Sequence, residues 1–255
     1  MPLGIRPTVD FVFKLLFGDP KNVDLLIHLL NSVLQPEHPI ENVTILNPYN
    51  EKQFKEDKLS IVDIKAQDTS GDWYIIEIQT TIPAGLANRL VYYTSGLYQA
   101  QMREKSAYSD LRPAISICFL TEPLFPEVPA GHLHFSLVDP VNSVSLGDQL
   151  QVHLIELSKY DILEEGLSEA EALENWIFFF TDAANRNAEE LRRLLPGAAF
   201  QKATGVLEMI SHSPELRLIY DDREKEAKDK FSIVKDALAE GEARGEARGE
   251  ARGEA

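Results

Sequence analysis

The sequence predicts a mixed α/β (α+β) fold, in which helices flank a central mixed sheet and an all-α appendage follows at the C-terminus. Helical apolar spacing opens the chain, and a hairpin with the two-residue period of strands follows at residues 61–79. From residue 168 onward the patterns are helical. We therefore expect a core at 1–160, a helical region at 161–239 and a low-complexity tail at 240–255.

Two helices and a short strand are predicted before the hairpin. Residues 8–17 have a helical apolar pattern that ends before Gly18, a residue that commonly stops helices. Residues 22–34 repeat leucine and valine at helical spacing, and Pro36 ends the pattern. Residues 43–46 are predicted to form a strand.

The hairpin contains the most informative pattern in the chain. Its loop, 69–71, places a glycine where a positive φ is favoured, and it pairs Asp68 with Asp72. Partners in an antiparallel pair have residue numbers with a constant sum, so Asp63 and Glu77 should face each other. Their Cβ atoms would lie about 4.5–5.5 Å apart, a distance at which like charges repel. Either one carboxyl group is protonated or a cation lies between them.

A further helix and three further strands complete the predicted core. The helix covers 86–106 and contains Gly96, which weakens it by about 1 kcal/mol relative to alanine. The strands are predicted at 115–120, 134–138 and 152–157.

The C-terminal helical region begins with a capping-box pattern. Ser168 and Glu171 have the spacing of such a box ahead of a helix at 172–181. Later helices are predicted at 186–195, 198–212 and 221–239. The tail repeats Gly-Glu-Ala-Arg, and regular glycines with like charges four residues apart disfavour an isolated helix. We expect the tail on its own to be weakly helical or disordered.

Composition and charge disfavour several classes of protein. No apolar run reaches roughly 18 residues, and the N-terminus lacks the apolar segment of a signal peptide, so we expect no membrane association. Cys118 is the single cysteine, which fits a reducing cytoplasm. The net charge of −16 argues against a simple nucleic-acid coat protein, although residues 1–135 account for only −5 of it (11 basic and 16 acidic side chains). The motifs HExxH, GxSxG, CxxC and the Walker loop do not occur.

An acid on one strand followed by Glu-x-Gln on the next strand is typical of a metal site. Hard divalent cations prefer oxygen ligands. Asp63, Glu77 and the main-chain carbonyl of Ile78 would supply three such oxygens. A cation held there can activate a water molecule and neutralise charge on a phosphoryl oxygen.

The segment VDIKAQDTSGDWYIIEIQ carries the spacing D-x13-E-x-Q, which resembles the core motif of the PD-(D/E)XK nuclease superfamily. The chain more narrowly resembles the Rpn recombination-promoting nucleases, also called PD-(D/E)XK family transposases. The segments PTVDFVFKLLFGD, LLNSVL and NRLVYYTSGLYQAQM agree with this family in order, over roughly residues 5–125, and the tail agrees loosely. The resemblance implies a restriction-endonuclease-like core.

The resemblance also implies roles for individual residues. Asp63 and Glu77 would be the metal-binding acids, with Mg²⁺ or Mn²⁺ as the cofactor. Gln79 stands where the superfamily usually has a lysine, and glutamine can form a hydrogen bond but brings no positive charge. Lys65 is predicted on the same face of the hairpin and can supply that charge. Asp10 resembles an additional acid that the superfamily carries on its first helix.

Each of these residues also has a simpler structural interpretation. The acid pair can lie on a solvated hairpin face, although Trp73 shares that face and disfavours exposure. Lys65 can be an ordinary solvated lysine, and Gln79 an ordinary polar strand residue. Asp10 falls in the first turn of its predicted helix, where an acid complements the helix dipole.

Taken together, we expect a Mg²⁺-dependent DNA endonuclease associated with recombination or a transposase-like role. Each subunit would have one site, so cutting a duplex suggests a homodimer. One alternative is a catalytically inactive nuclease-derived fold that binds a protein or DNA, which the missing lysine and the acidic charge favour. Another alternative is a phosphodiesterase that acts on RNA.

Overall fold

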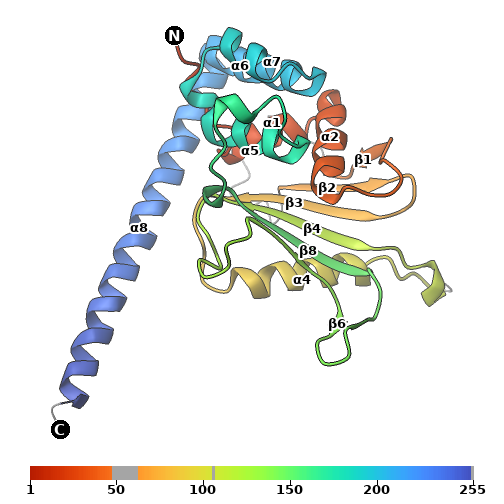
Figure 1. Ribbon diagram of the computed structural model, residues 1–255, viewed down its shortest axis with the longest axis vertical. Coiled ribbons are helices and arrows are strands. Elements are labelled where there is room, and N and C mark those ends of the chain that lie inside the picture. The colour runs from red at the N-terminus through yellow and green to blue at the C-terminus, as the bar shows by residue number, and fades with distance from the viewer. Residues whose placement is uncertain (48–62, 105–106, 254–255) are drawn as a thin grey trace.

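The structure is a computed structural model that describes residues 1–47, 63–104 and 107–253. Among these residues, a six-stranded mixed sheet has the strand order β1-β2-β3-β4-β8-β5 (Figure 1). Its strands are β1 (Val43–Ile45), β2 (Ile64–Asp68), β3 (Trp73–Gln79), β4 (Ala114–Leu120), β5 (His132–Phe135) and β8 (Leu150–Glu156). The short strands β6 (Val138–Asp139) and β7 (Val144–Ser145) form a separate ribbon.

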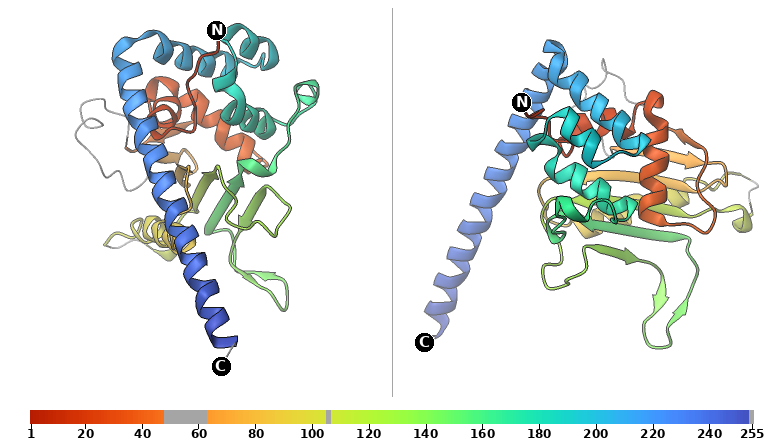
Figure 2. Two further views of the ribbon diagram at one scale, coloured as in Figure 1. Left: turned by 90° about the vertical axis from the view of Figure 1, so that its left-hand side faces the viewer. Right: turned by 45° about the horizontal axis from the view of Figure 1, so that its top comes forward.

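Helices cover both faces of the sheet, which confirms the predicted mixed α/β fold (Figure 1). One side carries α1 (Asp10–Phe17), α2 (Val23–Leu34), α5 (Ala172–Asp182), α6 (Ala188–Leu194) and α7 (Ala198–His212). The opposite side carries α4 (Leu86–Gln99). The final helix, α8 (Pro214–Gly253), runs past the sheet and extends well beyond the body of the molecule (Figure 2). No described helix is both apolar enough and long enough to cross a lipid bilayer.

The alternation of side chains along β3 explains why both faces are covered. Ile76 and Ile78 belong to the large core under α1, α2 and α5, whereas Ile75 belongs to a smaller cluster under α4. Phe13 of α1 and Phe180 of α5 have ring centroids 6.0 Å apart in the large core. The helical region at 161–239 therefore shares a core with the N-terminal residues. The division of the chain at residues 160 and 239 stays a prediction.

The hairpin between β2 and β3 has the predicted register. Gly71 has a φ of 92°, and the amide of Asp68 donates to the carbonyl of Asp72 at 3.1 Å. Ile64 pairs with Ile76, as the constant sum of residue numbers requires. Continuing this register by one residue places Asp63 opposite Glu77. Residues 61 and 62, which the sequence assigns to the same strand, lie outside the described residues.

One helix end and one helix cap differ from the prediction. The helix expected at 86–106 ends at Gln99, because the chain turns after its C-cap, Ala100. The capping box predicted for Ser168 and Glu171 was wrong by three residues. Glu171 is the N-cap, and its amide donates to the carboxylate of Glu174 at 2.9 Å.

The helix predicted at 221–239 is only part of α8. The helix begins at Pro214. Proline fits the first turn of a helix because N–H groups there form no hydrogen bond within the helix, so its missing N–H costs nothing. Its backbone continues through the glycine-rich repeat to Gly253. Arg6 holds α8 against the body, since its amide donates to the hydroxyl of Tyr220 at 3.1 Å.

Three histidines lie together between β5 and β8. Nε2 of His132 is 2.9 Å from Nδ1 of His153, and the ring of His134 stacks on His153 with centroids 4.2 Å apart. Burial, followed by the charges of His134 and His132, lowers the pKa of His153 from 6.5 to about 3. As the pH falls, His153 therefore becomes protonated in the unfolded chain at a higher pH than in the folded protein. The histidine then opposes folding below about pH 6.5.

We expect the variant His153→Gln to reduce the loss of stability at low pH. The free energy of unfolding of the wild type should fall between pH 7 and pH 5, with His153 accounting for about 2 kcal/mol of that fall. Urea unfolding at both pH values measures the difference. His38→Gln, at an exposed position, is the control. An unchanged pH dependence in His153→Gln would contradict the account.

Candidate functional site

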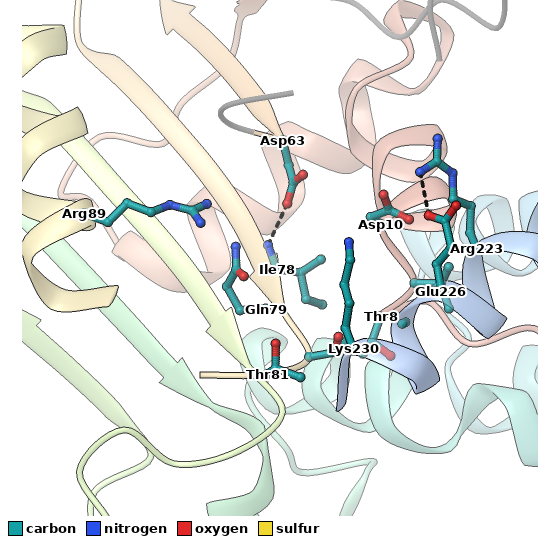
Figure 3. A pocket seen from close by; sticks show the side chains of 13 residues that line it. Thr8, Asp10, Asp63, Ile78, Gln79, Thr81, Arg89, Arg223, Glu226 and Lys230 are labelled. Atoms are coloured by element: carbon teal, nitrogen blue, oxygen red, sulfur yellow. Dashed lines mark hydrogen bonds and ion pairs between the residues drawn. The ribbon is translucent and has the colours of Figure 1, made fainter. Parts of the chain in front are cut away.

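A pocket with a volume of about 190 Å³ lies at the C-terminal end of β3 (Figure 3). The start of α1, the end of β3, α4 and α8 all contribute side chains to its wall. Four of the predicted site residues line it, namely Asp10, Asp63, Ile78 and Gln79.

Asp63 is held in this pocket by one main-chain and one side-chain contact. Its Oδ2 accepts a hydrogen bond from the amide of Ile78 at 3.0 Å, and its Oδ1 lies 3.4 Å from Nζ of Lys14. Burial raises the pKa of Asp63 and the charge of Asp10 adds to the rise, while Lys14 and the Ile78 amide oppose it. The carboxylate is thus fixed beside β3, the strand that carries Glu77.

Glu77 is almost completely buried, with a side chain that is 1% exposed. Its Oε2 accepts from Nη2 of Arg89 at 3.2 Å and from Nε2 of Gln79 at 3.4 Å. Its Oε1 has no hydrogen-bond partner among the described residues. Burial, followed by the charge of Asp63, raises the pKa of Glu77 to about 7. A buried acid with an unpaired oxygen beside a second acid is a group that a cation would stabilise.

Glu77 does not line the 190 Å³ pocket itself, in the part of the chain that is described. Gln79 and Arg89 do line it, and both donate to Oε2 of Glu77. The two predicted metal-binding acids are therefore connected to the pocket in different ways. Asp63 faces it directly, and Glu77 reaches it through the groups that hold its carboxylate.

The structure places Lys65 outside this pocket. Its Nζ lies 5.0 Å from the ring centroid of Trp73, and it lines a separate groove beside α4. Asp10 lines the pocket, and its Oδ1 accepts a hydrogen bond from the amide of Phe11 at 2.7 Å. This contact fits the simpler interpretation of Asp10 as an acid in the first turn of a helix, and it leaves Oδ2 available for other contacts.

Several basic residues at the site were not assigned a role from the sequence. Lys14, whose side chain is 11% exposed, pairs with Asp63. The feature of the sequence that could have identified it is that it is the single charged residue in the apolar run FVFKLLF. Arg89 forms an ion pair with Glu77. Arg223 and Lys230 of α8 also line the pocket, and Lys230 extends into it (Figure 3). No pattern in the sequence pointed to the last two, because they lie about 150 residues from the hairpin.

The donor chemistry of the site fits a hard divalent cation. Mg²⁺ and Mn²⁺ prefer carboxylate, carbonyl and water oxygens, and the unpaired Oε1 of Glu77 is such an oxygen. Among the described residues, no group of three or more His, Cys, Asp or Glu side chains is placed to hold a metal ion. The protein ligands would thus be two carboxylates, from Asp63 and Glu77, with main-chain oxygens and water completing the shell.

Comparison with known proteins gives one match. A family model described as PD-(D/E)XK nuclease family transposase matches residues 7–237. The matched range includes the hairpin, the pocket residues and the part of α8 that crosses the pocket. Neither the curated proteins nor the solved structures contain a significant match.

Proposed function

Because the chain belongs to the family of PD-(D/E)XK nuclease family transposases, we propose that it is a divalent-metal-dependent DNA endonuclease. Membership of the family supports a nuclease or transposase-like role. The observation that carries the proposal is the pair of neighbouring acids: Asp63 lines the pocket, and the buried Glu77 has an Oε1 without a hydrogen-bond partner among the described residues. A structural ion pair would not need the second acid.

The proposed mechanism assigns a task to each group in the pocket. Asp63, Glu77 and the carbonyl of Ile78 would hold Mg²⁺ or Mn²⁺, which when bound lowers the pKa of water and neutralises charge on the phosphate. The Ile78 amide and Lys14 keep the carboxylate of Asp63 in position. Arg89 binds Oε2 of Glu77, so that Oε1 is the oxygen available as a ligand.

Gln79 and Lys230 would act on the substrate. The amide of Gln79 can donate and accept hydrogen bonds, so it can orient the attacking water. Lys230 brings a positive charge into the pocket from α8, and a charge there would stabilise the phosphate as negative charge develops. The superfamily usually has a lysine where this chain has Gln79. Lys230 would thus supply the positive charge that this lysine brings in other members.

We expect Lys230→Ala to slow DNA cleavage about 10- to 100-fold, because one group that stabilises the developing charge is lost. The affinity for Mn²⁺ should not change, since Lys230 is not a ligand. The control is Lys228→Ala, because Lys228 lies on the same helix but pairs with Glu224 at 3.0 Å. Initial cleavage rates of a labelled duplex measure the effect. Equal losses in the two variants would show that only the general charge of α8 matters.

We also propose that two chains act together on DNA. Each chain has one proposed site, and a double-strand break requires two cuts. We propose a role in recombination or transposition as well, which the description of the family as transposases supports.

The proposed function is tested by incubating the protein with supercoiled plasmid and with labelled RNA, in Mg²⁺, Mn²⁺ or EDTA. We expect nicked and linear plasmid with either metal and intact plasmid in EDTA. Cleavage of RNA alone would contradict the assignment of DNA as the substrate. No cleavage of either nucleic acid would favour the catalytically inactive interaction module.

A further inference from the structure

The outer face of α4 is exposed beside the proposed active site. The helix lies over one face of the sheet (Figure 1), and its inner side chains, Leu86, Leu90 and Leu97, are buried. On the outer side, Val91 is 58% exposed and Tyr92 is 73% exposed. Val91 and Tyr92 are adjacent in the chain, and neighbouring exposed apolar side chains can mark a binding surface.

A groove with a volume of about 350 Å³ lies beside Tyr92, between α4 and the strands β2 and β3. Its lining includes Tyr92, Tyr93, Gly96 and Lys65. The rings of Tyr92 and Tyr93 meet edge to face, with centroids 5.5 Å apart. A Cβ atom built on Gly96 would contact nothing within 4 Å, so the glycine leaves the groove open. The groove therefore combines aromatic faces with a lysine.

The charge of this face differs from that of the rest of the chain. Residues 78–103 contain no Asp or Glu, and they form the longest acid-free run in a sequence with 41 acids. The same run contains Arg89 and Arg103, and Lys65 adds a positive charge from β2. In a protein with a net charge of −16, a groove whose described lining includes Lys65 and no acid favours an anionic partner.

Arg89 connects the groove to the proposed active site. Its Nη2 lies 3.2 Å from Oε2 of Glu77, and its guanidinium carbon lies 5.9 Å from the ring centroid of Tyr93. Arg89 lines the 190 Å³ pocket and Tyr93 lines the groove, so the contact between these two side chains joins the two walls.

We infer that the outer face of α4 binds an unpaired DNA strand next to the cut, with a base stacked on Tyr92 and Lys65 near the phosphates. Exposed aromatic rings beside basic side chains bind single strands because every base has a π-face, whereas paired bases are already stacked in the duplex. The inference rests on the proposed function and narrows its substrate. DNA with a single-stranded segment beside the cut should be preferred over continuous duplex.

The test compares Tyr92→Ala and Tyr92→Phe with Tyr108→Ala, since Tyr108 is 83% exposed at another surface position. Fluorescence anisotropy in EDTA measures the affinity for a labelled single strand and for the same sequence as duplex. Tyr92→Ala should weaken single-strand binding about 5- to 100-fold, because stacking contributes about 1–3 kcal/mol per base. Tyr92→Phe keeps the aromatic ring and should bind like the wild type, as should Tyr108→Ala.

The outcomes separate this inference from the proposed function. If Tyr92→Ala binds single strands as tightly as the wild type, or the wild type binds none, the inference is overturned even where plasmid is cut. If single-strand binding depends on Tyr92 but Mg²⁺ and Mn²⁺ produce no cleavage, the binding site stands and the endonuclease assignment fails.

Discussion

Asparagine in place of Asp63 is expected to lower Mg²⁺-dependent plasmid cleavage by about 1,000-fold. Asparagine has nearly the same shape as aspartate and retains an oxygen that can accept the hydrogen bond from the Ile78 amide. It has no negative charge, however, and it no longer pairs with Lys14. The loss should therefore affect metal binding and rate much more than the fold.

The matched control is Asp72→Asn, at the other end of the same hairpin. Asp72 is partly buried near Asp68, far along the strands from the pocket, and it does not line the pocket. It should cut at the rate of the wild type. Thermal unfolding of both variants verifies that the fold is intact. If Asp63→Asn cuts as fast as the wild type, Asp63 is not a ligand of the catalytic metal.

Alanine in place of Trp176 is expected to lower the free energy of unfolding by about 3–5 kcal/mol. Trp176 is fully buried, and its ring centroid lies 5.2 Å from Phe17 and 4.6 Å from Phe200. Its Nε1 also donates to Nδ1 of His28 at 2.9 Å, so the variant leaves that nitrogen without its donor. The side chain joins α1, α5 and α7, and α1 carries Lys14 to the site.

Urea unfolding of Trp176→Ala and Phe231→Ala measures this effect. Phe231 is 42% exposed on α8, and its removal should change stability by no more than about 0.5 kcal/mol. A loss below about 1 kcal/mol in Trp176→Ala would contradict the central role of this ring in the core.

The hairpin was predictable because local interactions determine it. The glycine of the turn fixes the loop, the loop fixes the register, and the register brings Asp63 and Glu77 together. The apolar run at 115–120 also predicted β4, because a strand buried on both faces is apolar at nearly every position, here at all but Ser116.

The wall of the pocket was not predictable, because it depends on packing between distant segments. Thr8, Asp63 and Lys230 meet only after α8 has packed against α1. The direction of the Lys65 side chain was also not predictable, because it depends on a contact with Trp73. Lys65 lies on β2 opposite Ile75 as expected, but its Nζ lies over the ring of Trp73, in the direction away from Glu77.

The energetics of Glu77 also favour function over stability as its explanation. A buried carboxylate with one unpaired oxygen opposes folding, and an apolar residue at this position of the strand would pack without that cost. Acids that weaken the fold and adjoin a polar pocket are typical of functional sites.

The most direct test of the central claim is calorimetric titration of Mn²⁺ into the metal-free wild type and into Glu77→Gln, without DNA. The account predicts a stoichiometry of about one Mn²⁺ per chain in the wild type, competition by Mg²⁺, and at least about tenfold weaker binding in Glu77→Gln. Glutamine preserves the size of the side chain, so a fold defect is not expected to cause the loss. Equal binding in the two proteins, or no binding by the wild type at millimolar Mn²⁺, would contradict the assignment of Asp63 and Glu77 as a metal site.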